Sequence, residues 1–319
     1  MDHYARLVRV PWKVPVMQAP IGPASTHELV AAVSGMGALG TLAASWTAPE
    51  ALRQQLQALR AAGLVEYCVN LILAFDQQER LDVVLEERAP FVSFSWGIDE
   101  ELIGRARERG AFVLVQVGDV ESAVEAAGRG AQAVIAQGVE AGGHVQGRTP
   151  VLELVREMRS TIQLPIVAAG GIASASSARA ALDAGADAVA CGTGFLVSIE
   201  ADVHPIYRER LLHAAATDTV LTGLFDVGWP DAPHRVIRSE TYATWEAAGC
   251  PPVGARSGEG EIVGSRAGSS IVRYSDAQPT SATEGDIDAM ALYAGTSVGH
   301  VRQRTTAQHI TKTILRAFT

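Results

Sequence analysis

The sequence predicts an α/β protein built as a (β/α)8 barrel, and two observations lead to that fold. Between residues 14 and 191, short apolar runs alternate with amphipathic stretches that have helical spacing, which is typical of βα units and a parallel sheet. Eight such runs are present, almost wholly apolar as strands covered on both faces must be, and eight is the number that closes a barrel. The strands are expected at residues 14–17, 38–42, 67–71, 91–94, 112–117, 133–136, 165–168 and 188–191.

Capping residues mark the helices between these strands. The Thr-Ala-Pro-Glu segment at 47–50 predicts a capping box with proline in the first turn, at the start of a helix that runs to about residue 60. Asp99, Asp119 and Ser174 are expected at the N-caps of three further helices, the last of them alanine-rich.

The pattern changes after about residue 201. A helix-like stretch at 205–216 is followed by 223–270, which is rich in Gly, Pro and Trp and shows no clean alternation. The run 287–298 is apolar and helical in tendency, so it is expected to return to the barrel. We therefore predict a barrel formed by residues 1–210 and 285–319, and a lid subdomain at 211–284 packed over one end of it. A disordered linker is the alternative, but several aromatic residues in this segment favour burial.

Composition excludes several classes of protein. Of the 319 residues, 48% are hydrophobic and 19% are charged, as in an ordinary globular chain. The formal net charge of −9 argues against a nucleic-acid partner. No apolar run has the length of a membrane helix, so a cytoplasmic enzyme without a membrane partner is expected. The three cysteines follow no disulfide or zinc pattern, so we expect buried reduced thiols and no metal.

The segment 137–144, Gln-Gly-Val-Glu-Ala-Gly-Gly-His, is the strongest functional signal. It places a glycine-rich loop with one histidine directly after the sixth predicted strand. Ligands of parallel barrels bind at the carboxyl ends of the strands. Glycines allow close approach of the backbone, and a neutral imidazole accepts a proton near neutral pH, so His144 is the candidate general base. Motifs for a nucleophilic serine and for a Rossmann dinucleotide site are absent.

Two glycine turns follow the last two predicted strands. Gly170 and Gly171 come after the seventh strand, and Gly192, Thr193 and Gly194 come after the eighth. Turns of this kind present unpaired backbone N–H groups near a helix N-terminus, and in this fold they form the usual phosphate site. A phosphorylated ligand is therefore expected, although glycines that only make tight turns are the alternative.

Other strand ends carry amides and small residues. Gln18 and Ala19 follow the first strand, Asn70 ends the third, and Gln137 ends the sixth, so their side chains or backbone are expected to contact a flat heterocycle. Trp96, after the fourth strand, is expected either on the substrate side or in packing.

Five segments together resemble the nitronate monooxygenase family, formerly called 2-nitropropane dioxygenases. The Glu-Ala-Gly-Gly-His segment, followed about 26 residues later by Ala-Gly-Gly-Ile, is specific to this group of FMN-binding barrels. The segments are Met-Gln-Ala-Pro-Ile at 17–21, Val-Asn-Leu at 69–71, the loop 137–144, Ala-Ala-Gly-Gly-Ile at 168–172 and Cys-Gly-Thr-Gly-Phe at 191–195.

The resemblance implies FMN as cofactor and oxidation of alkyl nitronates or nitroalkanes with molecular oxygen, with His144 as catalytic base. The phosphate would lie on the amides of the two glycine turns, and the flavin ring near the amide side chains. The implied cofactor-binding residues are Gln18, Ala19, Asn70, Gln137, Gly142, Gly170, Gly171, Cys191, Gly192 and Thr193.

The same motifs occur in flavin-dependent enoyl-acyl-carrier-protein reductases and in NAD(P)H:quinone reductases. After His144 the chain lacks the longer apolar insert of many monooxygenases, and Thr296 stands where the family usually has Gln. An NAD(P)H-dependent FMN reductase is therefore the alternative activity, and a flavin-free phosphate-binding barrel is a third. Closed barrels of this kind often pair, which leaves a homodimer open.

Overall fold

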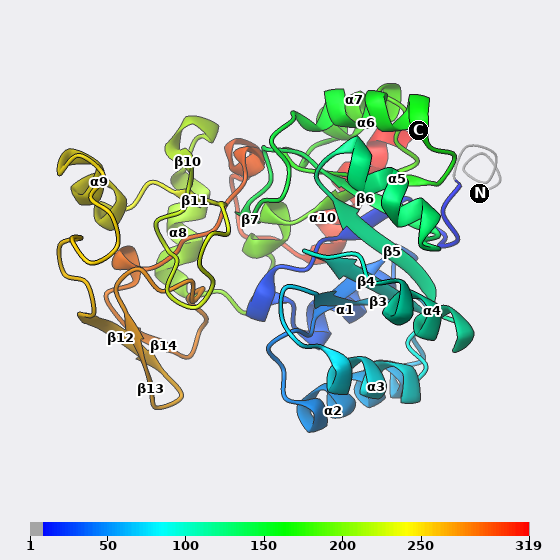
Figure 1. The fold of residues 1–319 in the computed structure, drawn as a ribbon, viewed down its shortest axis with the longest axis horizontal. Coiled ribbons are helices and arrows are strands. Elements are labelled where there is room, and N and C mark those ends of the chain that lie inside the picture. Colours follow the sequence, from blue (N-terminus) through cyan, green and yellow to red (C-terminus); the bar gives the residue numbers. More distant parts are fainter. Residues whose placement is uncertain (1–8, 319) are drawn as a thin grey trace.

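The computed structural model describes residues 9–318, and most of them form an eight-stranded parallel barrel (Figure 1). The strand order is β1-β9-β8-β6-β5-β4-β3-β2. The two ends of this order meet through a parallel bridge between Met17 and Leu39, where the Gln18 N–H donates to the Leu39 carbonyl at 2.9 Å. The strands are β1 (Val16–Gln18), β2 (Gly40–Ala43), β3 (Tyr67–Ile72), β4 (Phe91–Ser95), β5 (Phe112–Val117), β6 (Ala133–Gln137), β8 (Ile166–Ala169) and β9 (Ala188–Cys191).

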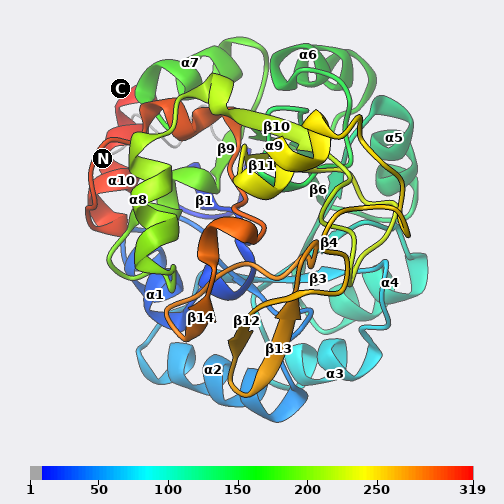
Figure 2. The ribbon, with the colours of Figure 1, turned by 90° about the vertical axis from the view of Figure 1, so that its left-hand side faces the viewer.

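Helices surround the barrel, as the view along its axis shows (Figure 2). One helix follows each of the first seven strands, and α10 packs between α1 and α7 to complete the ring. The predicted (β/α)8 fold is therefore confirmed, with every predicted strand found within two residues of its expected ends. The helices are α1 (His27–Ser34), α2 (Pro49–Ala61), α3 (Gln78–Glu86), α4 (Glu100–Glu108), α5 (Val120–Gly128), α6 (Val151–Thr161), α7 (Ala175–Asp183) and α10 (Ala307–Leu315).

The amino-terminal end of the barrel is filled with side chains. Trp12 lies under the strands, 2% exposed, and its ring meets Phe91 edge-on with centroids 5.8 Å apart. Met17, Leu39 and Leu114 belong to the same buried cluster. Because this end is packed, a ligand has room only at the opposite end, where the strands end and the loops begin.

The helix starts predicted from capping residues are partly confirmed. Asp99, Asp119 and Ser174 accept a hydrogen bond from a first-turn amide and cap α4, α5 and α7, as predicted. The capping box predicted at 47–50 is wrong, because the N-cap of α2 is Ala48, which has no side-chain acceptor. Proline at the first position supplies the start of this helix instead.

The expectation of a helix at 287–298 is also wrong. Only short 3-10 helices form there, η5 (Ile287–Ala289) and η6 (Thr296–His300), and the chain between them is extended. Besides short-range bonds within its two turns, this segment bonds to a barrel loop, since the Thr296 N–H donates to the Glu140 carbonyl at 3.0 Å. Its apolar residues are buried by these tertiary contacts.

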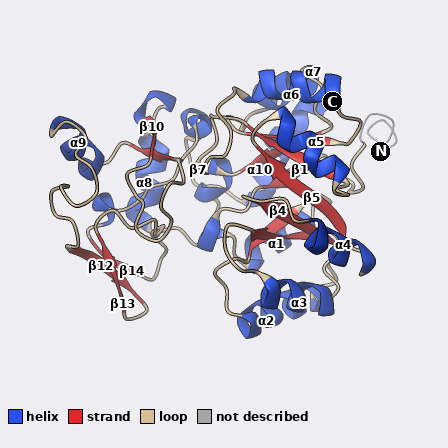
Figure 3. Cartoon of the chain, viewed as in Figure 1, coloured by secondary structure: helices blue, strands red, loops and turns tan. Residues whose placement is uncertain are grey.

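Residues between β9 and α10 form a second lobe of short elements and long loops beside the mouth of the barrel (Figure 3). One sheet has the order β10-β11-β7 and the other β13-β12-β14. The predicted division at 210/211 and 284/285 remains a prediction. The elements are η3 (Thr193–Val197), α8 (Pro205–His213), η4 (Ala216–Asp218), β10 (Thr219–Thr222), β11 (His234–Ile237), α9 (Glu240–Ala247), β12 (Ile262–Arg266), β13 (Ser269–Val272) and β14 (Thr283–Gly285).

Two further sequence expectations concern surface and burial. Within residues 9–318, no helix combines the length and the apolar character needed to cross a bilayer. Cys68 and Cys191 are buried thiols, as expected, whereas Cys250 is exposed. Cys250 lies in a turn after α9 with φ at 57°, outside any packed element.

Candidate active site

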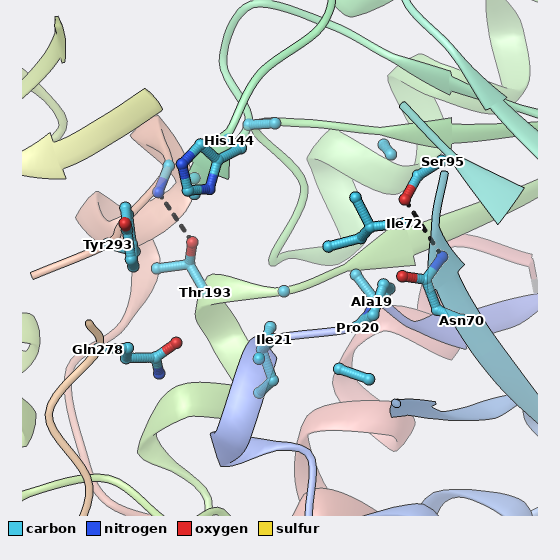
Figure 4. A pocket seen from close by; sticks show the side chains of 18 of the residues that line it. Ala19, Pro20, Ile21, Asn70, Ile72, Ser95, His144, Thr193, Gln278 and Tyr293 are labelled. Carbon is cyan, nitrogen blue, oxygen red and sulfur yellow. Dashed lines mark hydrogen bonds between the residues drawn. The ribbon is translucent and has the colours of Figure 1, made fainter. Parts of the chain in front are cut away.

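A cavity of about 560 Å³ lies at the carboxyl ends of the barrel strands, between the barrel mouth and the second lobe (Figure 4). Most of its lining comes from the loops that follow the barrel strands, and the rest from the segments around residues 228, 266, 277 and 293 of the second lobe. The residues predicted as ligand contacts that line it are Ala19, Asn70, Gln137, Gly142, His144, Gly170, Gly171, Gly192 and Thr193.

His144 is positioned by a short strand that joins the barrel to the second lobe. It forms β7 (Gly143–His144), which pairs antiparallel with β11 so that His144 stands opposite His234. Gln137 holds the same loop from the barrel side: its Nε2 donates to the His144 carbonyl at 3.1 Å, and its Oε1 accepts from the Gln146 N–H at 2.8 Å. The amide of Gln137 therefore orients the loop, in addition to lining the cavity.

The imidazole of His144 lies among aromatic rings. Trp229 stacks on it, with centroids 4.2 Å apart and an interplanar angle of 27°. The rings of Tyr293 and His234 lie 5.5 Å and 5.3 Å away. The Nε2 atom is buried and has no hydrogen-bond partner among the described residues. Burial first, and the nearby His234 second, lower the pKa of His144 to about 3, so the ring is neutral at physiological pH.

This lowered pKa predicts a pH-dependent stability. Because the folded state resists protonation of His144 between pH 6.5 and about 3, the contribution of the neutral ring is present above pH 6.5 and is lost as pH falls. Between pH 7 and 5 we expect about 2 kcal/mol of unfolding free energy to be lost, at 1.36 kcal/mol per unit below pH 6.5. Urea titrations of wild type and His144→Asn at both pH values measure this loss as a difference.

The comparison with a variant is needed because a second group, Asp276, also titrates in this pH range. Burial raises its pKa to about 6, so its contribution is present below pH 3.8 and is lost as pH rises through 6, opposite in sign to that of His144. Both proteins contain Asp276, which cancels in the difference. Equal pH dependence in the two proteins would contradict the assigned state of His144.

The two glycine turns present free backbone amides to the cavity. In the described part of the chain, no acceptor lies against the N–H of Gly170, Gly171 or Gly192. Gly170 and Gly171 have φ of 120° and 69°, which favour glycine. The α-helix expected after the eighth strand is replaced by the five-residue η3, and the Thr193 hydroxyl accepts from the Gly295 N–H at 2.9 Å. The second turn therefore lacks the N-terminus of an α-helix, and the free backbone amides are what would bind an anion there.

The profile of the family described as nitronate monooxygenase matches residues 6–77 and 64–317. The chain belongs to the nitronate monooxygenase family. It is therefore an oxidoreductase of a family of flavoenzymes.

Three relatives illustrate the range of the family. The nitronate monooxygenase of Pseudomonas aeruginosa is 32% identical over 300 residues, covering 79% of this chain and 84% of that protein. A probable nitronate monooxygenase of Staphylococcus saprophyticus is 31% identical, with coverage of 72% and 76%. The third relative comes from Mycobacterium tuberculosis and is a (3aS,4S,5R,7aS)-5-hydroxy-7a-methyl-1-oxo-octahydro-1H-indene-4-carboxyl-CoA dehydrogenase. It is 33% identical over 73% of this chain, and the match spans 65% of the dehydrogenase, just under two thirds.

Two solved structures share the fold over nearly the whole chain. FabK from Thermotoga maritima superposes with a TM-score of 0.81 at 31% identity, covering 96% of this chain and 93% of that one. The nitroalkane oxidase from Streptomyces ansochromogenes gives a TM-score of 0.76 at 27% identity, with coverage of 98% and 96%.

Two residues that the family resemblance implied as cofactor contacts do not line the cavity. The Gln18 side chain is fully buried: its Oε1 accepts from the Thr41 N–H at 2.9 Å and its Nε2 donates to Ser25 Oγ at 3.1 Å. Gln18 thus links β1 to β2. Cys191 is 1% exposed and packs in the cluster between the sheet and the helices. Both side chains therefore lie within the barrel wall, and the implied contacts of these two residues with a cofactor stay predictions.

Asn70 and Gly142 line the cavity with additional structural roles. Asn70 Nδ2 donates to the Ser93 carbonyl at 3.2 Å and to Ser93 Oγ at 3.1 Å, which fixes the side chain at the rim. A Cβ on Gly142 would stand 2.4 Å from the Gly295 nitrogen and 2.6 Å from the Ala294 carbonyl carbon. Gly142 is therefore glycine because the returning chain at 294–295 packs directly on it.

Several site residues in the second lobe were missed from sequence. Trp229, Tyr293, Asp276 and Gln278 line the cavity, and their segments have no periodicity that would have placed them there. His234 is fully buried beside His144. Its Nδ1–H donates to the Ala232 carbonyl at 2.9 Å and its Nε2 accepts from the Phe225 N–H at 3.1 Å, so it is a neutral residue that holds the loop carrying Trp229.

Proposed function

We propose that this protein oxidises alkyl nitronates and nitroalkanes with molecular oxygen, using bound FMN and His144 as the base. One observation carries the proposal. Among the described residues, His144 is the only histidine that lines the cavity, and the same cavity contains the free amides of both glycine turns. Membership of the nitronate monooxygenase family supports this reaction.

The residues around the glycine turns fit the phosphate of FMN. The N–H groups of Gly170, Gly171 and Gly192 have no protein acceptor and are therefore available to phosphate oxygens. A Cβ on Gly192 would lie 3.3 Å from Ile21 Cγ2, on the wall of the same cavity, so a side chain there would narrow the cradle. The cavity volume lies within the range of roughly 300–1,000 Å³ typical of cofactor and ligand sites.

The chain's own residues account for proton transfer and orientation. When bound, the flavin supplies the redox chemistry, taking electrons from the substrate and passing them to oxygen. His144 enters the reaction neutral, so it accepts the acidic α-proton of a nitroalkane without first losing one. The imidazolium that forms is covered by the stacked face of Trp229, and this cation–π contact offsets part of the cost of burying the charge. Gln137 keeps the imidazole in place through the loop backbone.

Removal of the phosphate from the cofactor provides a test. We expect the deflavinated protein to bind FMN at least about 100-fold more tightly than riboflavin, because hydrogen bonds to a charged group contribute roughly 1.5–3 kcal/mol each. Quenching of flavin fluorescence measures both dissociation constants. Equal affinities would show that the glycine turns do not bind the phosphate.

An NAD(P)H-dependent reductase is the second candidate, because the chain lacks the longer apolar insert after His144 and has Thr296 where the family usually has Gln. Anaerobic mixing of the purified protein with NADH, and separately with a nitronate, distinguishes the two activities. Bleaching of the flavin by the nitronate alone supports the proposed oxidation, and rapid bleaching by NADH supports the reductase. A colourless protein that takes up no flavin would instead indicate the flavin-free barrel.

A further inference from the structure

Beside His144, aromatic side chains from four loops form a continuous wall, which we call the aromatic wall and define as Trp46, Phe75, Trp96 and Trp229. The ring centroids of Trp46 and Phe75 are 4.5 Å apart, those of Phe75 and Trp229 are 5.1 Å apart, and those of Trp229 and Trp96 are 4.9 Å apart. All three contacts are edge-to-face. The three tryptophans line the cavity, and Trp229 also stacks on His144.

Packing of the protein core does not explain the whole wall. Trp229 is buried, at 7% exposed, but Trp46 is 54% exposed although it lines the cavity, and none of the four residues belongs to the hydrophobic clusters of the core. A large aromatic surface left open at a cavity is typical of a ligand site.

Trp96 is held in the cavity in a strained backbone conformation. It follows β4 with φ at 58°, a left-handed conformation that bulky residues rarely adopt. The turn packs closely on the preceding loop: a Cβ on Gly97 would stand 2.7 Å from the Leu73 Cβ, and the Leu73 N–H donates to the Ser95 carbonyl at 2.8 Å. Strain of this kind persists where the surroundings enforce it, and it is concentrated in functional sites. In this turn it directs an indole into the cavity.

The wall lies across the barrel mouth from the predicted phosphate site. The glycine turns follow β8 and β9, whereas Trp46, Phe75 and Trp96 follow β2, β3 and β4. In the closed strand order, β4 is opposite β9 and β3 is opposite β8. The wall therefore borders the side of the cavity away from the phosphate and next to the base.

We propose that the aromatic wall binds an aryl group of the substrate, so that the preferred substrates are nitro compounds or nitronates with an aromatic ring close to the nitro-bearing carbon. This inference rests on the proposed function and specifies its substrate class. Ring edges and faces at these angles complement a flat aromatic group, which gains more from such contacts than a short alkyl group of the same reactivity. An aryl group against Trp96 and Trp229 places the neighbouring carbon near His144.

Steady-state kinetics test the preference. The holoenzyme is assayed for oxygen consumption with the nitronates of 1-nitro-2-phenylethane and of nitroethane. We expect kcat/KM at least tenfold higher for the phenyl compound, and a fall of at least fivefold in this ratio for Trp96→Leu and for Trp229→Leu. Trp245→Leu, in the second lobe and outside the cavity, is the matched control and keeps the ratio of wild type.

The ratio separates recognition from general damage. A variant that merely disturbs His144 lowers both kcat/KM values equally, and an unchanged ratio in both Trp96→Leu and Trp229→Leu would overturn the proposal. So would a wild-type enzyme without preference for the phenyl compound. A weaker dissociation constant for FMN in Trp96→Leu, with an unchanged substrate ratio, would assign the wall to the cofactor instead.

A binding measurement separates this proposal from the proposed function. Nitrobenzene and the aliphatic comparison 2-methyl-2-nitropropane both lack an α-hydrogen, so the binding of each to the oxidised holoenzyme is followed without turnover through the flavin absorbance. We expect nitrobenzene to bind at least tenfold more tightly than 2-methyl-2-nitropropane, and the difference to shrink in Trp96→Leu. If no nitronate is oxidised but this difference is present, the proposed function fails and the aryl site stands. If nitronates are oxidised and the difference is absent, the aryl site fails alone.

The strain at Trp96 gives a second readout. Glycine tolerates φ at 58° without cost, so Trp96→Gly is expected to melt at a temperature no lower than Trp96→Leu, while losing the aryl preference to the same extent. A melting temperature of Trp96→Gly markedly below that of wild type, with the aryl preference retained, would show that the ring is kept for the fold, and would count against the proposal.

Discussion

His144→Ala is expected to lower kcat for the oxidation of neutral nitroethane by about 10²–10⁴-fold, the range that a positioned general base contributes. The reason is geometric: the imidazole lies in the cavity beside the barrel mouth, and its buried Nε2 has no hydrogen-bond partner among the described residues. The flavin is expected to remain bound, because the free amides of the glycine turns are distant in sequence and unaffected. Oxygen consumption and the visible spectrum measure the two properties.

The substrate form sharpens this test. When nitroethane is supplied as its preformed nitronate, no proton has to be removed, so the loss in His144→Ala is expected to be smaller than for the neutral compound. His213→Ala is the matched control, since that side chain is 78% exposed on α8 and far from the cavity lining. Turnover of neutral nitroethane unchanged from wild type would remove His144 as the base.

Gly142→Ala is expected to destabilise the fold by about 3 kcal/mol or more, at the upper end of the range for overpacking. The added Cβ would stand 2.4 Å from the Gly295 nitrogen and 2.6 Å from a neighbouring carbonyl carbon, and neither backbone group can move aside as a flexible side chain would. The loop that holds His144 and the chain returning from the second lobe would have to separate. Denaturant unfolding monitored by circular dichroism measures the loss.

Gly223 is the control that separates a steric clash from a general effect of replacing glycine by alanine. A Cβ on Gly223 meets no heavy atom within 4 Å and its φ is not in the left-handed region, so Gly223→Ala is expected to change stability by less than about 0.5 kcal/mol. Equal stability of Gly142→Ala and wild type would mean that the loop and the returning chain are not packed as described.

The helix starts show how far local signals extend. Asp99 and Asp119 were placed correctly because an acidic side chain at an N-cap satisfies amides within its own turn. The same reasoning failed at residues 47–50, where Ala48 takes the cap position. It also failed at 287–298, because apolar residues there pack on other segments instead of forming a helix face.

The Asn and Gln residues at the strand ends show a similar limit of prediction from sequence. Gln137 and Asn70 were expected at the cavity because they end barrel strands, and both line it. The partners of their amide groups could not be derived, since the Gln137 amide bonds to the loop backbone seven and nine residues later. Gln18, with the same strand-end position, is turned into the barrel wall by its bond to Thr41.

The sequence by itself determined the barrel and the end of it that carries the chemistry. Buried parallel strands must be apolar along their length, and residues directly after such strands must lie at one rim, so His144 and the glycine turns could be placed from local pattern alone. The tertiary structure decided what surrounds the base. Trp229 and Tyr293 come from irregular segments and His234 begins β11, and all three reach His144 only through the long-range pairing of β7 with β11 and its contacts. The low pKa of the imidazole depends on that burial, which no local pattern encodes.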